Sequence, residues 1–477
     1  MLKNKYFYLS LLLLITLFFY YDYRVSNLKS ERQSIRDNLS SITKDYDILK
    51  KKYNEYFEGR KYIYRDYNKN LEYRFQEKKI LNYRDENLAL KQFVSDDLSL
   101  GKNPHSFGVI KSSSYIDFFG DNIYLITGDG LIYFSDFLKN IKNSEEKIIF
   151  SKIQSNLDSL IKDKYFYENT YIGIKDIKII DNEIYISHSN KVEQDCYNTA
   201  LLKAEINYEY LTFEKYFSPN ECVTSDNPFT NNKWSQGGRI VEINGDDNNK
   251  ISMSQGTWGY EILAQNPKSL MGKIILVEDL KNYKILSSGH RNIQGLYFDK
   301  KNNLFLETEH GPRGGDEVNI IKLENDNLNF GWPISSYGDH IITTMTGQGN
   351  KVKPLTEEEI KSLYDRAPMH KTHVDHGFNE PVKYFEKSAG ISDIVKISNN
   401  ENLYVYGTMR RCDEKEINGC SLYFIKFDEN HEEVLDEQQF YIGQRVRDLT
   451  FINQFNILVL FLENENAIGI IDLKKLN

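Results

Sequence analysis

Residues 302–319, NNLFLETEHGPRGGDEVN, join an apolar run to a loop that contains a proline, two glycine turns and acidic residues. A polar Asn/Asp turn followed by an apolar strand recurs along the chain as GDNIYLIT (from Gly120), DNEIYISH (Asp181), NNKISMSQ (Asn248), NENLYVYG (Asn400) and QFNILVLF (Gln454). Alternation at a period of two is typical of strands, and regular repetition of short strand units is typical of radial blades. The pattern predicts an all-β six-bladed β-propeller over residues 99–477, with a large β-sandwich as the alternative.

The N-terminal stretch KNKYFYLSLLLLITLFFYYDYR, which begins at Lys3, has the pattern of a membrane anchor. Two lysines precede an apolar run of about the length that crosses a bilayer. The run ends in Phe18, Phe19, Tyr20 and Tyr21, which is typical of an interfacial aromatic belt rather than of a small-residue cleavage site. We expect a transmembrane helix at residues 1–25 that anchors the chain in the inner membrane and places the remainder in the periplasm. A cleaved signal peptide is the alternative.

A heptad-like pattern follows the apolar run. Its members are four and three residues apart, and they include Leu28, Ile35, Leu39, Ile42 and Leu49. Such spacing is typical of a coiled-coil seam, and a more aromatic helical pattern continues to about Phe93. We expect a helical stalk over residues 26–98 that supports a homo-oligomer. A lone amphipathic helix is the alternative.

Composition and cysteine content restrict the classes of partner. The net charge of −9 and the pI of about 5.7 argue against a nucleic-acid-binding surface. The four cysteines lie in polar, turn-like sequence and do not form a C-x-x-C motif, which argues against zinc or thiol-redox chemistry. In an oxidising compartment the simplest pairing is Cys196 with Cys222 and Cys412 with Cys420, although the sequence leaves three connectivities open.

Three segments carry the chemistry: GHRNIQG at residues 289–295, TEHGPRGGDEVN at 308–319 and GQRVRDLTF at 443–451. We expect the 308–319 loop to lie at one end of the central channel. The carbonyl groups of Gly311 and Pro312 suit a hard cation, and Asp316 and Glu317 either brace the loop or add oxygen ligands. Three arginines in the same segments add positive charge, namely Arg291, Arg445 and Arg447. The segments therefore indicate an anionic ligand bridged by a divalent cation, and the alternative is that the arginines pair with carboxylates of the scaffold.

The segment from GHRNIQG through TEHGPRGGDEVN to NFGWPISSYG resembles the soluble pyrroloquinoline-quinone (PQQ)-dependent aldose dehydrogenases of the glucose/sorbosone dehydrogenase family. Weaker similarity extends over AQNPKSLMGKIILV, FNEPVKYFEKSAGIS and GQRVRD. The resemblance implies a six-bladed propeller that oxidises an aldose, a small-molecule sugar, by hydride transfer to PQQ. It also implies Ca²⁺ against the quinone, held by the Gly311 and Pro312 carbonyls. The cofactor contacts that it implies are Arg291, Asn292, Gln294, Ser388, Arg410, Arg445 and Arg447.

The sequence departs from the family at the catalytic base. The family has a histidine four residues before the arginine of an H-x-x-G-R-L strand, whereas WSQGGRIVEI has Ser235 at that position and Arg239 at the arginine. Thr257 stands where the family has the partner aspartate. A serine cannot accept the sugar proton at neutral pH without a base of its own, and His310 is a candidate substitute. The residues therefore leave enzymatic activity open between a dehydrogenase with a relocated base and a non-catalytic propeller that keeps the ligand pocket.

Overall fold

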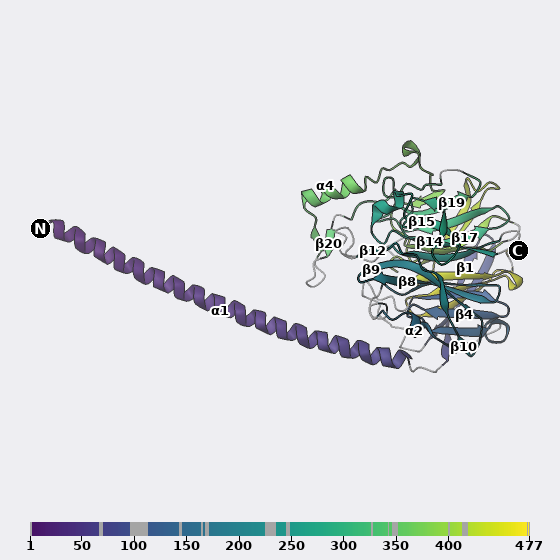
Figure 1. Cartoon of the computed structure of the whole chain (residues 1–477), viewed down its shortest axis with the longest axis horizontal. Helices are drawn as coiled ribbons and strands as arrows, with labels where there is room; N and C mark the ends of the chain where they lie inside the picture. The colour runs from purple at the N-terminus through teal and green to yellow at the C-terminus, as the bar shows by residue number, and fades with distance from the viewer. Residues whose placement is uncertain are drawn as a thin grey trace. The chain divides into compact units, whose positions relative to one another are not determined.

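The computed structural model describes a chain of two compact units, Met1–Tyr67 and Asn68–Asn477 (Figure 1). We call the second of these the β-unit. The described residues are 2–65, 70–95, 113–142, 146–163, 166, 171–224, 235–244, 249–325, 328–341, 343–345, 352–398, 401–412, 418–474 and 476.

The first unit is a single helix, α1 (Leu2–Arg65). The predicted seam residues Leu28, Ile35, Leu39 and Ile42 are exposed along it. Among the described residues, no helix is both long enough and apolar enough to cross a membrane. Much of the predicted anchor falls on residues 2–13, whose side chains lie outside the described part of the chain.

The helical stalk is shorter than predicted, because residues 71–95 form strands. β1 (Leu71–Tyr83) and β2 (Glu86–Ser95) pair as an antiparallel hairpin. The expectation of helix up to Phe93 is wrong here, and the burial pattern gives the physical reason. Every second side chain at the two ends of β1 is buried, as is typical of a strand with one face in a core. The β-unit therefore begins well before residue 99, and residues 96–98 of the predicted stalk lie outside the described residues.

The β-unit consists of antiparallel strands in groups of four. The first three groups along the chain are β3 (Ser114–Phe119), β4 (Asn122–Thr127), β5 (Ile132–Asp136), β6 (Lys147–Ser155); β7 (Ile174–Ile180), β8 (Glu183–Glu193), β9 (Cys196–Glu205), β11 (Glu214–Phe217); and β13 (Gly237–Asn244), β14 (Asn249–Gln255), β15 (Lys273–Val277), β16 (Tyr283–Ser288). The next three are β17 (Ile293–Asp299), β18 (Leu304–Glu309), β19 (Asp316–Lys322), β22 (Lys383–Phe385); β23 (Ile391–Lys396), β24 (Leu403–Thr408), β25 (Ser421–Phe427), β26 (Val434–Tyr441); and β27 (Val446–Ile452), β28 (Ile457–Leu462), β29 (Ala467–Asp472) with β2.

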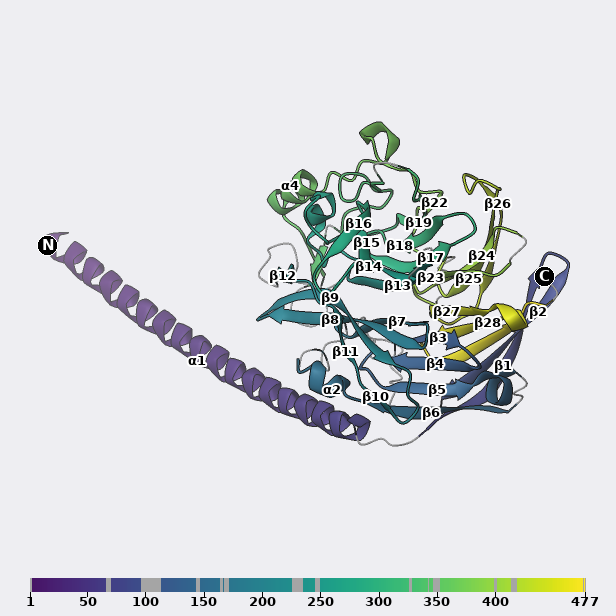
Figure 2. The same ribbon diagram turned by 45° about the vertical axis from the view of Figure 1, so that its right-hand side comes forward.

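The first strands of these groups contact one another in a closed circle, in the order β3, β7, β13, β17, β23, β27 and back to β3. The sheets follow one another around the β-unit in chain order, from blue β4 through teal β8 and green β18 to yellow β28 (Figure 2). The arrangement is all-β and propeller-like. The six recurring sequence units are the second strands of their groups, β4, β8, β14, β18, β24 and β28, and not the innermost ones.

The N-terminal hairpin closes the circle. β2 pairs with β29 and completes the group formed by the C-terminal strands. β1 pairs with both β2 and β6, so that the last and first groups belong to one ten-stranded sheet. This pairing covers edges that would otherwise be unpaired, and it explains why β1 and β2 adopt strand conformation.

Shorter elements lie outside the groups. β10 (Tyr210–Leu211) pairs with β6 and β12 (Val223–Thr224) pairs with β9, while β20 (Thr343–Met345) and β21 (Val352–Pro354) form a hairpin. The described helices of the β-unit include α2 (Leu157–Leu160) and α4 (Glu357–Arg366), and α4 begins at a capping box formed by Thr356 and Glu359.

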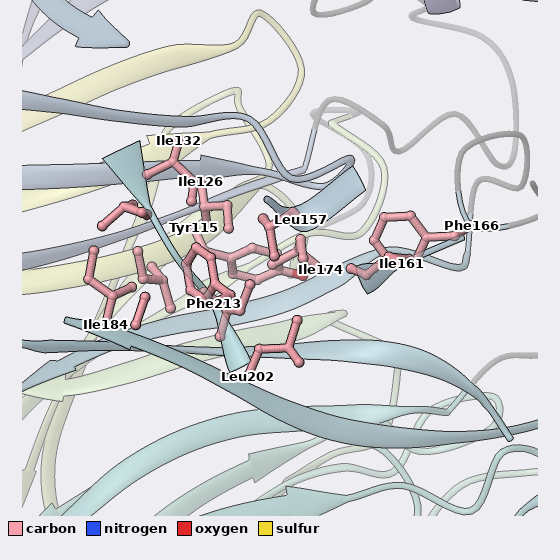
Figure 3. Close-up of a cluster of buried hydrophobic side chains, with 14 of the residues drawn as sticks. Tyr115, Ile126, Ile132, Leu157, Ile161, Phe166, Ile174, Ile184, Leu202 and Phe213 are labelled. Atoms are coloured by element: carbon pink, nitrogen blue, oxygen red, sulfur yellow. The ribbon is translucent and has the colours of Figure 1, made fainter. Parts of the chain in front are cut away.

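Apolar side chains fill the space between neighbouring sheets. One cluster lies between the β3–β6 group and the β7–β11 group and includes Tyr115, Ile126, Ile174, Ile184 and Leu202 (Figure 3). Central strands are buried on both faces, as in β28, where all six residues are apolar and buried. Packing of this kind holds the first strands in place around the centre of the β-unit.

Aspartates join neighbouring first strands. Asp117 on β3 accepts a hydrogen bond from the backbone N–H of Ile179 at 2.7 Å, and Asp176 on β7 accepts one from Ile240 at 2.7 Å. Asp393 on β23 accepts a hydrogen bond from the backbone N–H of Leu449 on β27. Asp448 on β27 accepts one from Ile116 on β3. Backbone donors that the ladders leave unpaired at the centre are satisfied in this way.

Arg239 on β13 crosses the centre of the ring. Its guanidinium lies 3.2 Å from Asp176 Oδ1, contacts Asp448 Oδ1, and donates to the backbone oxygen of Arg447 at 3.1 Å. The residue is only 5% exposed. Arg239 therefore pairs with Asp176 and Asp448, while Lys178 lies 3.0 Å from Asp117.

The structure pairs Cys196 with Cys222 and Cys412 with Cys420, which are the two bonds that the sequence favours. The first bond joins the start of β9 to the segment ahead of β12. The second closes a loop that follows β24.

Candidate functional site

The predicted site residues come together at one edge of the ring. In an antiparallel pair the start of the first strand lies beside the end of the second, as the register Ile293↔Glu309 shows for β17 and β18. We call this edge the mouth. It consists of the residues that precede the six first strands, the first two residues of those strands, and the residues that follow the six second strands. The predicted residues that lie there are Ser235, Thr257, Arg291, Asn292, Gln294, His310, Gly311, Pro312, Ser388, Arg410, Arg445 and Arg447.

Arg291 organises the fourth group at the mouth. Its Nη1 donates hydrogen bonds to the backbone oxygens of His310 at 3.0 Å and Gly311 at 3.1 Å. Its guanidinium also lies over the Trp332 ring, 5.3 Å from the centroid. The buried Nε of Arg291 has no hydrogen-bond partner among the described residues. The described residues therefore leave one charged donor of this arginine unsatisfied.

Asp316 holds the 310–316 loop by bracing its backbone. Its Oδ1 accepts a hydrogen bond from the N–H of Gly311 at 2.9 Å, and its Oδ2 accepts from Ala389 at 2.7 Å and Gly390 at 2.6 Å. Of the two roles expected for Asp316, the structure supports bracing. The expected ligand role stays a prediction, because Oδ1 accepts one hydrogen bond and keeps a second lone pair.

Two other predicted residues have contacts that the sequence did not indicate. Ser388, expected at the cofactor, accepts a hydrogen bond from the N–H of Gly314 at 2.6 Å and so also supports the loop. Gly314 has a φ of +78°, and a Cβ there would lie 2.1 Å from the backbone oxygen of Glu386, so the tight turn requires glycine. Glu317, expected near the cation, is buried and lies 3.7 Å from His373.

Arg445 and Arg447 lie on the same side of the β27 segment, as their alternation predicts, and both bind Glu463 just after β28. Arg445 Nε lies 2.6 Å from Glu463 Oε2, and Arg447 Nη2 lies 2.8 Å from Glu463 Oε1. Burial opposes ionisation of Glu463, but the two arginines and the Ser113 hydroxyl outweigh it and lower the pKa to about 2. Sequence reasoning missed Glu463, whose signal was a lone acid directly after the apolar run of β28.

A chain of polar side chains links the groups across the mouth. Arg447 Nη1 donates to Gln294 Oε1 at 3.2 Å, and Gln294 Nε2 donates to Asn292 Oδ1 at 3.1 Å. Asn292 Nδ2 lies 3.4 Å from His310 Nδ1. The β17 and β27 groups thus form one continuous polar surface. Arg410 is exposed at this edge.

The segments that carry Ser235 and Thr257 lie side by side, as expected for the two members of the family dyad. The backbone N–H of Trp258 donates to the oxygen of Ser235 at 2.8 Å, and the N–H of Thr257 donates to the oxygen of Arg291 at 3.0 Å. The Thr257 hydroxyl donates to Glu261 at 2.8 Å. Both side chains are buried, and neither is a base.

Lys175 is a second mouth residue that sequence reasoning missed. It is the second residue of β7, and its Nζ donates to the Tyr171 oxygen at 2.5 Å. That oxygen also accepts from Gln236 Nε2 at 2.9 Å, so the amine lies next to the segment of Ser235. Burial, with a further contribution from the positive charge of Arg447, lowers the pKa of Lys175 to about 7. The residues next to Lys175 in the sequence do not distinguish it from the many other lysines of the chain.

We expect acid to weaken the β-unit partly through Glu463. Its folded-state pKa lies below the ordinary value of 4.5, so its contribution to stability is present above pH 4.5 and is lost as the pH falls toward 2. In the Glu463→Gln variant, the slope of unfolding free energy against pH in this window should be smaller by up to one proton, or about 1.4 kcal/mol per pH unit. Denaturant unfolding at pH 2.5 to 5 measures this, and identical slopes would contradict the assigned role of Glu463.

The β-unit is similar to proteins of a known family. The model of the family described as Glucose / Sorbosone dehydrogenase matches residues 172–469, more than half of the chain. The uncharacterized protein slr1608 of Synechocystis is 27% identical over 219 residues, which are 43% of this chain and 46% of that protein. Aldose sugar dehydrogenase YliI of Escherichia coli is 25% identical over 233 residues, which are 45% of this chain and 53% of that protein. The matches thus span about half the length of these curated relatives.

Solved structures agree on the fold of the β-unit. A crystal structure of glucose dehydrogenase superimposes with a TM-score of 0.54 at 18% identity, over 75% of this chain and 95% of that chain. The apo form of the soluble aldose sugar dehydrogenase of E. coli gives 0.53 at 18% identity, over 75% and 94%. Together with the family match over residues 172–469, these findings show that the chain belongs to the Glucose / Sorbosone dehydrogenase family.

Proposed function

We propose that this protein binds PQQ at the mouth and oxidises an aldose with it. The observation that carries the proposal is the arrangement of Arg291, Asn292, Gln294 and Arg447 on one continuous polar surface, at the positions that match the family. The names of the similar proteins, a glucose dehydrogenase and an aldose sugar dehydrogenase, support the same reaction class.

The charges at the mouth fit a planar tricarboxylate. Arg291 keeps one buried N–H without a partner in the described chain, and Arg445 has a side chain that is 30% exposed. Glu463 neutralises only part of the charge of the two arginines that it binds. The surface therefore has positive charge and free donors, which are the features that carboxylates need.

Ca²⁺ beside the quinone is part of the proposal, with the carbonyls of Gly311 and Pro312 as its protein ligands. The Gly311 carbonyl accepts a hydrogen bond from Arg291 at 3.1 Å, but a carbonyl oxygen has a second lone pair. Asp316 and Ser388 fix the loop from behind, so that the carbonyls would be held in place before a cation binds.

PQQ, when bound, supplies the acceptor for the hydride from the sugar. The chain itself must bind the sugar and remove a proton from its hydroxyl group. Ser235 cannot do this, but two other groups at the mouth can accept protons. The His310 ring lies beside Asn292, whose Nδ2 is 3.4 Å from its Nδ1, and the pKa of Lys175 is close to neutral.

A second candidate function is a non-catalytic propeller that binds the cofactor or a related anion. The specific observation in its favour is that Ser235 and Thr257 occupy the dyad positions, with the Thr257 hydroxyl committed to Glu261. On this reading the six strand groups are blades of a six-bladed propeller that presents a ligand pocket.

We also propose that α1 anchors the chain in the inner membrane, supports a homo-oligomer and places the β-unit in the periplasm.

Anaerobic mixing of an aldose panel with the PQQ- and Ca²⁺-loaded full chain separates the two functions. We expect the absorbance of the bound quinone to shift from the oxidised to the reduced form, slowly compared with an enzyme that has a positioned base. Lys175→Met and His310→Gln, each tested alone, identify the group that accepts the proton, because losing it should slow the reduction by about 10²-fold or more. Bound quinone that no aldose reduces would favour the binding module.

A further inference from the structure

A buried polar cluster lies one step away from the mouth, within the β17–β18–β19 sheet. His290 precedes β17, while Glu307 and Glu309 are alternate residues of β18 and therefore point to the same face. His290 and Glu307 are fully buried, and Glu309 is 3% exposed. The proposed function above uses neither His290 nor Glu307.

The three side chains converge on one point. His290 Nδ1 lies 3.5 Å from Glu309 Oε1 and 4.0 Å from Glu307 Oε2. One ligand atom from each residue lies within 4.8 Å of the others. Spacing of this size leaves room for an ion that binds one imidazole nitrogen and two carboxylate oxygens.

The histidine is held in the orientation that a metal ligand needs. Its Nε2 is 2.8 Å from the Ser287 hydroxyl oxygen, and its ring stacks on Phe330 with centroids 5.0 Å apart. A hydrogen bond from Nε2–H to Ser287 leaves the lone pair on Nδ1, which faces the two carboxylates. A ligating histidine typically donates its other ring N–H to such a second partner.

Several buried atoms in the cluster lack a hydrogen-bond partner among the described residues. They are His290 Nδ1, Glu307 Oε1 and Asn319 Oδ1. Asn319 Nδ2 donates to Glu307 Oε2 at 2.9 Å, so the amide belongs to the same cluster. Two acids buried this closely need a cation or a proton between them.

We propose that His290, Glu307 and Glu309 bind a divalent transition-metal ion such as Zn²⁺ or Mn²⁺. The mixed nitrogen and oxygen donors suit this class better than Ca²⁺, which prefers oxygen ligands alone. The site is separate from the cation that we place at Gly311 and Pro312. It is linked to the mouth because Glu309 Oε2 accepts a hydrogen bond from the N–H of Arg291 at 2.6 Å. The ion would therefore fix the segment that positions Arg291.

The test uses the full chain, produced in medium supplemented with Zn²⁺ or Mn²⁺ and purified without chelator, with the metal content measured by inductively coupled plasma mass spectrometry. We expect about one equivalent of the ion in the wild type, and affinity that is at least tenfold weaker in His290→Asn and in Glu307→Gln. Glu307→Gln keeps the side-chain volume, so it guards against a variant that fails to fold. His431→Asn is the matched control, because His431 is a buried histidine that bonds to Tyr404 in another group.

Metal retained by His431→Asn and lost by the other two variants supports the site. Wild-type chain without transition metal, or with the same metal content in all variants, overturns it and means that Glu307 is neutralised by a proton. PQQ binding to the wild-type chain, measured on the same preparation, tests the proposed function separately. A wild-type chain that holds the metal and binds no PQQ would contradict that function and leave the metal site supported.

Discussion

Replacing Arg239 with methionine should lower the free energy of unfolding of the β-unit by about 3–5 kcal/mol, the usual cost of removing one partner from a buried ion pair. The arginine is 5% exposed and faces Asp176 and Asp448 across the centre of the ring. Without it, Asp176 and Asp448 lose the guanidinium that pairs with both of them. Methionine fills much of the volume, so the loss reports mainly on charge.

Arg84→Met is the matched control for this prediction. Arg84 also pairs with an aspartate, Asp436 at 3.3 Å, but both side chains are 44% exposed. An exposed ion pair typically contributes less than about 1 kcal/mol. Denaturant unfolding of both variants gives the comparison, and an equal, small loss in the two would show that Arg239 is not the charge that holds the centre together.

The second large effect is expected at the position of the family base. Ser235→His should speed quinone reduction by an aldose about 10²-fold, the lower end of the usual gain from a positioned general base. Ser235 has a φ of 58°, and histidine is among the residues that tolerate this left-handed region best. Ser235→Ala is the matched control, and it should leave the rate unchanged because the hydroxyl is not a base.

Aspartate at position 257 is a poorer choice for restoring the family pair. The Thr257 hydroxyl donates to Glu261 Oε2, which also accepts a hydrogen bond from Trp332 Nε1 at 2.6 Å. A second carboxylate there would face like charge. If Ser235→His binds PQQ normally yet is no faster than the wild type, the assignment of position 235 to the base is wrong.

Strand repetition could be read from the sequence, but the position of each strand in its sheet could not. Each recurring unit is a polar turn followed by a second strand. Second strands are covered on both faces, so their pattern of buried residues is the clearest in the sequence. The sequence predicts helix for the β1–β2 hairpin because the middle of β1, around EKKI, does not show the alternation of buried and exposed residues that marks a strand. Its conformation follows from pairing with β29 and β6, which are distant in the chain.

The same limit applies to the site. Arg291, Asn292, Gln294 and the 310–316 loop lie in one continuous motif, and the sequence placed them together. Glu463 and Lys175 lie far from that motif, and their roles depend on the closure of the ring, which brings β28 and β7 to the mouth. The bracing role of Asp316 depends on the backbone of Ala389 and Gly390, and it could not be separated from a ligand role before those atoms were placed.

Equilibrium binding of PQQ to the full chain in the presence of Ca²⁺ tests the central claim, that the mouth is a cofactor site. We expect one PQQ per chain, with affinity reduced about 10- to 100-fold in Arg291→Met, the usual cost of losing one or two charge-assisted hydrogen bonds. Arg313→Met removes an exposed arginine of the neighbouring 310–316 loop, and this variant should bind as the wild type does. Absence of PQQ binding in the folded wild-type chain, or equal affinity in the Arg291 variant, would contradict the claim.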